Sequence, residues 1–178
     1  MIVRLIEREL KTKFGIFREI LYYDGQTESI ALVMGDVETQ ENVFCRIHSS
    51  CISAHVFNSV ECECREEMET AQILIQQEGK GVIIYLDQEG KGNGHLALIA
   101  SIKHKKAGLS QSEAYKKVGF EADAGRFRPA AEILSDLKIK SVVLLTNNTE
   151  KAEDLRRASI IVSDTKRVTI STERNDYI

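Results

Sequence analysis

Two short apolar runs, at residues 81–86 and 141–146, constrain the fold of this chain more than any other feature. Both lie between segments in which apolar residues recur at helical spacing. Buried strands that alternate with helices favour layered α/β structure. We therefore expect an α/β (mixed α+β) fold, in which mixed sheets are covered by helices. The predicted helices are residues 65–77, 96–107, 111–118, 128–137 and 150–158, and a last short strand is predicted at residues 160–162.

The first sixty residues have a different pattern, which is typical of antiparallel strands. Apolar segments at residues 15–24 and 29–34 flank Gly25-Gln26, which indicates a hairpin, and residues 43–47 continue the strand pattern. The length of 178 residues fits one domain. We predict a single domain over residues 1–178, with a β-rich part at about 1–60 and an α/β part at about 61–165.

Charge and hydropathy exclude several classes of protein. The formal net charge is −3, whereas a nucleic-acid binder usually has a basic excess. The longest apolar stretch, residues 81–86, is too short to span a bilayer. Charges interrupt the apolar residues near the N-terminus, which is not typical of a signal peptide. We expect a cytoplasmic protein that binds neither nucleic acid nor membrane, and reduced cysteines that serve as ligands or nucleophiles.

Cys51, Cys62 and Cys64 form the main chemical signal of the sequence. Two of them make Cys62-Glu-Cys64 just before a predicted helix, whose N-terminus favours ionised thiols. Thiolates bind zinc, and three protein ligands leave a fourth position open for water, as in catalytic sites. Cys45 would close the site as a fourth thiolate, and His48 and His55 are further possible ligands. The alternative interpretation is that all four cysteines are small buried apolar residues.

Five segments in order resemble the GTP cyclohydrolase II family, zinc enzymes that open the guanine ring of GTP at the start of riboflavin synthesis. They are Arg46-Ile-His-Ser-Ser-Cys51, Cys62-Glu-Cys64, Tyr85-Leu-Asp-Gln-Glu-Gly-Lys-Gly-Asn-Gly94, Gly119-Phe-Glu-Ala-Asp123 and Leu144-Leu-Thr-Asn-Asn148. The resemblance implies that the three cysteines hold Zn²⁺. It also implies that zinc activates a water molecule, that a ring carbon leaves as formate, and that the protein is a homodimer.

The same resemblance implies roles for other residues. It places Asp123 at the active site. The chemistry of Glu89 makes it a candidate catalytic residue, as a general base or as an acceptor for a guanidine-like ring edge. The residues that the resemblance assigns to substrate binding are Arg46, Gln88, Glu89, Lys91, Gly92, Thr146 and Lys151. The alternative interpretations are a solvated loop residue for Glu89, surface residues for the two lysines, and a turn at a strand end for Thr146.

Two departures from the family pattern affect residues next to the expected reaction. Gly125 occupies the position of an arginine that has been proposed as the family's nucleophile toward phosphate, and Arg126 stands one residue later. A slip of one residue reverses the side chain's face in a strand, although a loop could tolerate it. Arg126 is therefore the candidate replacement. Leu98 and Ile102 stand where the family has lysine and tyrosine.

Positive charge is also lost at Glu61 and Asp87, where the family has arginine. Each lost contact to phosphate costs about 1.5–3 kcal/mol, so triphosphate binding should be weak.

Three hypotheses for the function follow from these motifs and departures. The first is a zinc-dependent hydrolase that opens a cyclic amidine or amide in a heterocycle other than GTP. The second is a diverged GTP cyclohydrolase II, and the third is a non-catalytic homologue stabilised by zinc. His55 and His95 are additional candidates for proton transfer.

Overall fold

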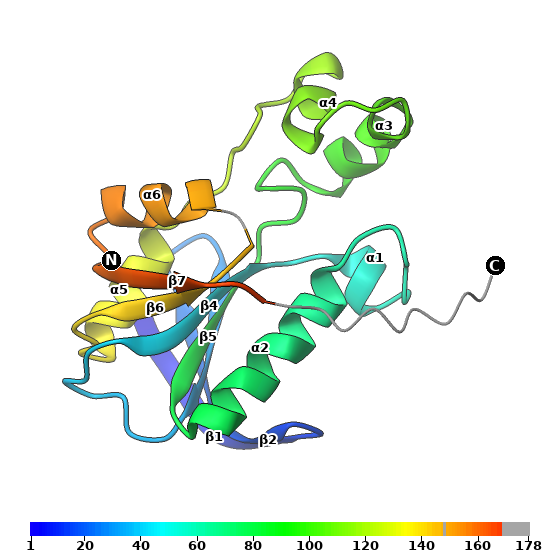
Figure 1. The fold of residues 1–178 in the computed structure, drawn as a ribbon. Helices are drawn as coiled ribbons and strands as arrows, with labels where there is room; N and C mark the ends of the chain where they lie inside the picture. The colour runs from blue at the N-terminus through cyan, green and yellow to red at the C-terminus, as the bar shows by residue number, and fades with distance from the viewer. Residues whose placement is uncertain (148, 169–178) are drawn as a thin grey trace.

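The computed structural model describes residues 1–147 and 149–168, with the backbone alone at 149–151 and 154, and contains one seven-stranded mixed sheet (Figure 1). The strand order is β1-β2-β3-β5-β4-β6-β7. The strands are β1 (Val3–Thr12), β2 (Gly15–Tyr23), β3 (Glu28–Met34), β4 (Val43–Ser49), β5 (Gly81–Leu86), β6 (Val142–Leu145) and β7 (Val162–Lys166). The helices are α1 (Ile52–His55), α2 (Cys64–Glu78), α3 (His95–Lys106), α4 (Gln111–Lys117), α5 (Arg128–Asp136) and α6 (Thr149–Arg157). The predicted α/β fold with a mixed sheet is confirmed.

Half of the sheet is antiparallel and half is parallel. Strands β1, β2, β3 and β5 pair antiparallel in that order, and β5, β4, β6 and β7 continue in parallel. The predicted hairpin joins β2 to β3, where Asp24 accepts hydrogen bonds from the amides of Gln26 and Thr27, each at 2.8 Å. The carboxyl ends of β4, β5 and β6 reach the same edge of the sheet, which is the usual place for ligands in such folds.

Different helices cover the two faces of the sheet. Alternate residues of β5 show the division, since Val82, Ile84 and Leu86 belong to one apolar core and Ile83 to the other. The first core includes buried residues of α5 and α6, and the second includes Ala71 and Ile75 of α2. This alternation follows from the two-residue repeat of a strand. Among the described residues, no helix is both long and apolar enough to cross a bilayer.

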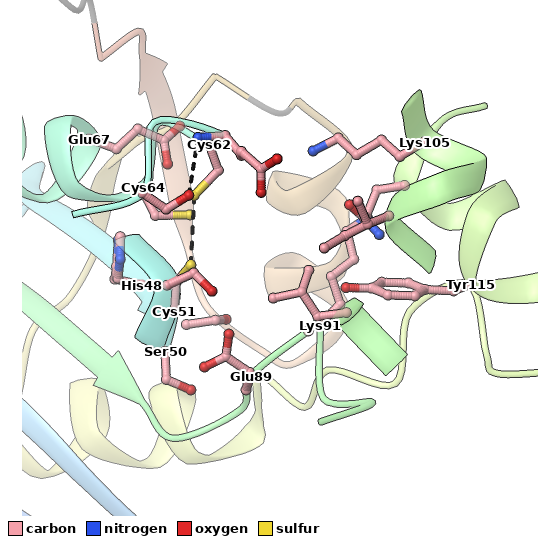
Figure 2. A pocket seen from close by; sticks show the side chains of 18 of the residues that line it. His48, Ser50, Cys51, Cys62, Cys64, Glu67, Glu89, Lys91, Lys105 and Tyr115 are labelled. Carbon is pink, nitrogen blue, oxygen red and sulfur yellow. Dashed lines mark hydrogen bonds between the residues drawn. The ribbon is translucent and has the colours of Figure 1, made fainter. Parts of the chain in front are cut away.

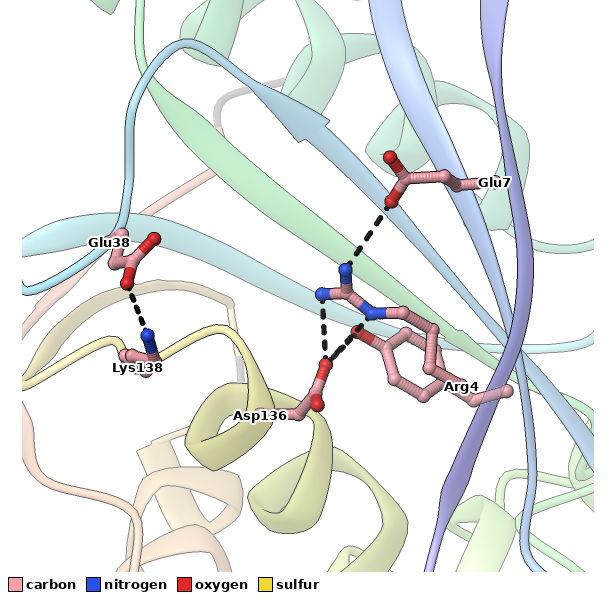
Figure 3. Close-up of polar contacts among 6 residues, drawn as sticks. Arg4, Glu7, Glu38, Asp136 and Lys138 are labelled. Carbon is pink, nitrogen blue, oxygen red and sulfur yellow. Dashed lines mark hydrogen bonds and ion pairs between the residues drawn. The ribbon is translucent and has the colours of Figure 1, made fainter.

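The edge strand β1 is held to α5 by a polar cluster (Figure 3). Asp136 at the end of α5 accepts a hydrogen bond of 2.7 Å from the buried Tyr22 hydroxyl. The same carboxylate pairs with the Arg4 guanidinium at 2.9 Å, and Arg4 also contacts Glu7 at 3.3 Å. Burial of the hydroxyl, together with this carboxylate, raises the pKa of Tyr22.

Helices α3 and α4 form a unit that projects from the sheet edge (Figure 1). They pack mainly on each other, with Gln111 donating to Ser101 at 3.0 Å. Ser110 and Glu113 form a capping box that starts α4. Residues 87–94 lead into the unit and residues 118–127 lead out, and the two segments touch where the Ala124 amide donates to the Lys91 carbonyl at 2.9 Å.

Most predicted elements occur within one or two residues of their expected bounds, with three differences. Strand β1 was not predicted as a separate element, because most of its residues are exposed and charges interrupt its apolar pattern. The last strand, expected at residues 160–162, is β7 at Val162–Lys166. Ile160 is buried in the core, but it lies before the strand begins. The prediction counted it as a strand residue because it is apolar, and therefore set the strand too early. Helix α1 was not predicted, because its four residues are too few for an apolar repeat.

Candidate functional site

The three cysteines are brought together by two segments that meet beyond the end of β4. Cys51 lies directly before α1, whereas Cys62 lies before α2 and Cys64 begins it. Arg65 joins the segments, because its guanidinium donates to the carbonyl of Ala54 at 2.6 and 2.9 Å. The three Sγ atoms lie within 4.8 Å of one another, and those of Cys51 and Cys62 are 3.7 Å apart (Figure 2).

The three thiols differ in acidity. A hydrogen bond from the Cys64 thiol lowers the pKa of Cys62 to about 5, assisted by the Cys64 backbone amide and by the charge of Lys105. The same hydrogen bond raises the pKa of Cys64, and burial raises that of Cys51. The cluster thus contains one thiolate and two thiols at neutral pH when no metal is bound.

This donor set fits zinc. Three sulfur atoms at this spacing match a tetrahedral thiolate site with its fourth position free of protein. Within residues 1–147 and 149–168, no histidine or carboxylate belongs to the group, so His48 and His55 are not part of it. Cys45 is fully buried in the larger core, and the interpretation as a small apolar residue is correct for it. The prediction of a zinc cofactor is confirmed by this cluster.

The cysteines open onto a cavity of about 650 Å³ between the sheet edge and the α3–α4 unit. Figure 2 shows the sulfur atoms on one wall and Tyr115 of α4 on the other. Leu98 and Ile102 of α3 line the cavity with Tyr115, which gives it an apolar wall opposite the metal ligands. An ion pair of 2.9 Å joins α3 to the segment that carries the metal ligands, between Lys106 and Glu61, the residue before Cys62.

Glu89 presents a carboxylate to the same cavity. Its Oε2 accepts a hydrogen bond of 2.9 Å from the amide of Ile52, the residue after Cys51. Its Oε1 is buried and has no hydrogen-bond partner among the described residues, with His95 Nδ1 at 3.7 Å. The side chain is 10% exposed and already close to the metal ligands. One oxygen is therefore anchored to the segment that carries Cys51, and the other is buried without a hydrogen-bond partner among the described residues.

Arg46 and Lys91 also line the cavity, and both have protein partners. The buried Arg46 guanidinium contacts Glu67 at 2.6 Å and donates to the carbonyl of Leu145 at 3.1 Å. Lys91 donates to Ser112 at 3.2 Å and lies 3.8 Å from Asp123. Asp123 also accepts a hydrogen bond of 2.8 Å from the Gly125 amide.

Three other predicted site residues line a second hollow, behind the segment that carries Glu89. They are Gln88, Gly92 and Arg126. The Arg126 amide donates to Gln88 at 2.9 Å, and the Gln88 side chain donates to Ser49 at 3.1 Å. The structure therefore separates Arg126 from the cavity that holds the cysteines.

The remaining two predicted binding residues follow β6. Thr146 is buried directly after the strand. Lys151 belongs to α6, but its side chain lies outside the described residues.

The structure adds Glu67 and Tyr115 to the set found by sequence reasoning. Glu67 lies three residues after Cys64, so both side chains share one face of α2 and the sequence contained a usable signal. Tyr115 is buried beneath the cavity, and burial raises its pKa to about 12. Nothing in its local sequence distinguishes it from a core tyrosine.

Fold and site together define an α/β protein with a cysteine zinc site that opens onto a substrate-sized cavity. Comparison with known families narrows this class, because the profile of the GTP cyclohydrolase II family matches residues 3–168. The chain belongs to the GTP cyclohydrolase II family, as its motifs predict.

Several relatives support the assignment. The riboflavin biosynthesis protein RibBA of Bacillus mycoides is 40% identical over 166 residues, which are 92% of this chain and 42% of the relative. RibBA of Bacillus cytotoxicus is 40% identical over 87% of this chain. The chain thus spans about two-fifths of the length of these relatives. GTP cyclohydrolase-2 of Actinobacillus succinogenes is 38% identical over 99% of this chain and 81% of its own length.

Among solved structures, the chain is similar to RibBX, described as a two-domain 3,4-dihydroxy-2-butanone 4-phosphate synthase from A. baumannii. The overlap covers 83% of this chain and 34% of that protein, with a TM-score of 0.48 and 19% sequence identity.

Proposed function

We propose that this chain is a zinc-dependent cyclohydrolase that opens a nitrogen heterocycle other than GTP by hydrolysing a cyclic amidine or amide C–N bond. One observation carries the proposal: the three-cysteine cluster and the Glu89 carboxylate line one cavity, to which Leu98, Ile102 and Tyr115 add apolar surface. Ring hydrolysis requires a metal site, a proton acceptor and a surface for a flat ring, and this cavity combines all three.

The proposed roles of the residues follow from their positions. Bound zinc supplies Lewis acidity and makes hydroxide available near neutral pH. Glu89 accepts the proton of the water that adds to the ring, because its carboxylate lines the cavity with the three cysteines and Oε2 is anchored to the Ile52 amide. Leu98, Ile102 and Tyr115 hold the ring against the cysteine wall.

Two features support a substrate other than GTP. Gly125 has no side chain to offer a phosphate, and Arg126, its candidate replacement, lines the second hollow. Two lysines of the metal cavity also have acidic neighbours, since Lys106 pairs with Glu61 and Lys91 lies 3.8 Å from Asp123. A triphosphate would have to break these pairs before it gained any attraction from them.

Turnover of GTP itself is the second candidate function. It is favoured by the 38% identity to a protein named GTP cyclohydrolase-2 over nearly the whole chain. In this case Lys91 and Lys105, which both line the cavity, would contact the phosphates. A zinc-stabilised homologue without catalysis is the third candidate.

A substrate panel separates the three candidates. The zinc-loaded protein is incubated with GTP, GMP, guanosine, guanine and a set of pyrimidines, and products are followed by mass spectrometry and a formate assay. The proposal expects a ring-opened product from an uncharged or weakly charged ring, with little turnover of GTP. Preferential turnover of GTP would support the second candidate, and inertness toward the panel would support the third. Glu89→Gln is the control for adventitious hydrolysis.

A further inference from the structure

The buried ion pair between Arg46 and Glu67 occupies the part of the cavity wall that could bind an anion. Arg46 projects from β4 and is the only arginine among the described residues that line this cavity. Its NH2 group is 2.6 Å from Glu67 Oε2, and the two side chains are 7% and 21% exposed. Its NH1 group donates to the Leu145 carbonyl, and NH2 also lies 3.4 Å from His48 Nδ1.

This geometry leaves the guanidinium with one nitrogen, the buried Nε, that has no hydrogen-bond partner among the described residues. A phosphate binds arginine best through two parallel hydrogen bonds from one edge of the guanidinium. Here both terminal nitrogens already contact protein acceptors, and the closest of these is a carboxylate. An incoming phosphate would have to displace Glu67 and would then face its negative charge.

Other cations of the cavity do not compensate. Lys106 is paired with Glu61, and Lys91 lies between Ser112 and Asp123. Lys105 projects from α3 toward the cysteine wall in Figure 2. Three of the four cations that line the cavity therefore lie near carboxylates, and Glu89 adds a further carboxylate to the lining.

We propose that Glu67 is a specificity-determining residue that closes an anion subsite by holding Arg46, so that the cavity selects heterocycles without phosphate groups. The inference rests on the proposed function insofar as it concerns the substrate of the same cavity. The mechanism predicts that loss of the Glu67 charge exposes a buried cation, because an unpaired buried guanidinium favours any anion that can replace its partner.

Binding of inorganic pyrophosphate and of GTP tests this directly, by calorimetry on the zinc-loaded protein. Wild-type protein should bind pyrophosphate only weakly. Glu67→Gln should bind both probes at least about tenfold more tightly, the effect of one recovered charge-assisted contact. Glu69→Gln is the matched control, because it removes the same charge from the exposed part of α2, where Glu69 pairs with Lys13. It should leave binding unchanged.

The double variant Arg46→Gln/Glu67→Gln should lose the gain. Persistence of the gain in the double variant would overturn the inference, since Arg46 would then not be the responsible group. Tight binding of pyrophosphate by the wild-type protein would overturn it as well, whatever the variants do. If Glu67→Gln folds poorly, Glu67→Met removes the carboxylate while it keeps the apolar stem of the side chain, and the same gain is expected.

These measurements do not depend on turnover. Failure of the substrate panel would remove the proposed reaction but not the role of Glu67 in excluding anions. Conversely, if the wild-type protein binds pyrophosphate tightly and still opens an uncharged ring, the role of Glu67 is wrong and the proposed reaction stands.

Discussion

At the scale of single residues, the thiol cluster predicts how zinc binding depends on pH. Cys62 is already ionised at neutral pH, whereas the raised pKa values of Cys51 and Cys64 keep those thiols protonated. Zinc binding should therefore release about two protons at pH 7. Above pH 5, the affinity should rise with pH, with a slope near two on a logarithmic scale, until the two thiols ionise in the free protein.

Calorimetry in buffers of different ionisation enthalpy measures this release. Cys45→Ala is the control, because Cys45 lies in the core and should not change the proton count. Release of three protons would show that Cys62 is not a thiolate in the metal-free protein, and the described acidity of the cluster would be wrong.

Glu89 carries the second prediction at this scale. Glu89→Gln should lower turnover of the ring substrate by about 10²–10⁴-fold, the usual contribution of a general base. Zinc content should stay the same, because Glu89 contacts the Ile52 amide and not a sulfur atom. Steady-state rates together with metal analysis check both parts. The neighbouring Asp87→Asn, at an exposed position, should leave both nearly unchanged.

Sequence reasoning identified the zinc ligands because cysteine chemistry is specific and its spacing is local. It could not separate Gln88 from Glu89, which line different cavities although they are adjacent. Adjacent residues of an extended segment face opposite sides, but the sequence does not show which side faces the metal. The ion pair of Glu67 with Arg46 was not predicted either, because it joins residues of two different elements that are 21 positions apart in the sequence.

At the scale of elements, Gly92 holds the two connections of the α3–α4 unit together. Its φ is +80°, and a Cβ there would lie 2.6 Å from the Ala124 carbonyl oxygen, which is backbone and cannot move freely. Gly92→Ala should separate the two segments and lower the midpoint of thermal unfolding by several degrees. Gly94→Ala is the control, since its φ is +87° but its Cβ would meet no atom within 4 Å. Equal effects of the two changes would exclude the contact as the cause.

The polar cluster between β1 and α5 gives the next prediction. Asp136→Asn should destabilise the fold by about 1–3 kcal/mol, because it weakens the hydrogen bond to the buried Tyr22 hydroxyl and the pair with Arg4. Denaturant unfolding measures the change. Glu7→Gln, which weakens only the other contact of Arg4, should have a much smaller effect.

The raised pKa of Tyr22 gives this cluster a dependence on pH. Above about pH 10 the unfolded chain can ionise this tyrosine, whereas the folded protein cannot. Stability should therefore fall as the pH rises through this range. Since Asp136 contributes to the raised pKa, the fall should be shallower in Asp136→Asn.

The predictability of the elements follows from how each one is buried. Strand β5 was predicted with its observed bounds because both of its faces are covered, which leaves an uninterrupted apolar run. Strand β7 is exposed at most positions after Val162, so its polar residues have no strand-like apolar pattern. Helix α2 was predicted from apolar residues at helical spacing, and it ends at Gly79, whose left-handed conformation is typical of a glycine after a helix.

At the scale of the whole molecule, the homodimer that the resemblance implies remains a prediction. Sedimentation equilibrium should give a mass of about 40 kDa, which is twice the 20.0 kDa of the chain. A mass of one chain at micromolar concentration would contradict it. Metal-stripped protein is the useful comparison, because it shows whether association requires the zinc site.

The residues proposed for the reaction and the residues proposed to hold the ring lie on different parts of the fold. The metal ligands and Glu89 lie outside the α3–α4 unit, on the segments that follow β4 and β5 and at the start of α2. The apolar residues Leu98, Ile102 and Tyr115 belong to the two helices of the unit. In the proposed reaction, substitutions within residues 95–117 would change the surface offered to the ring and leave the metal ligands and Glu89 in place. Exchange of this helical pair alone would then be enough to change the substrate.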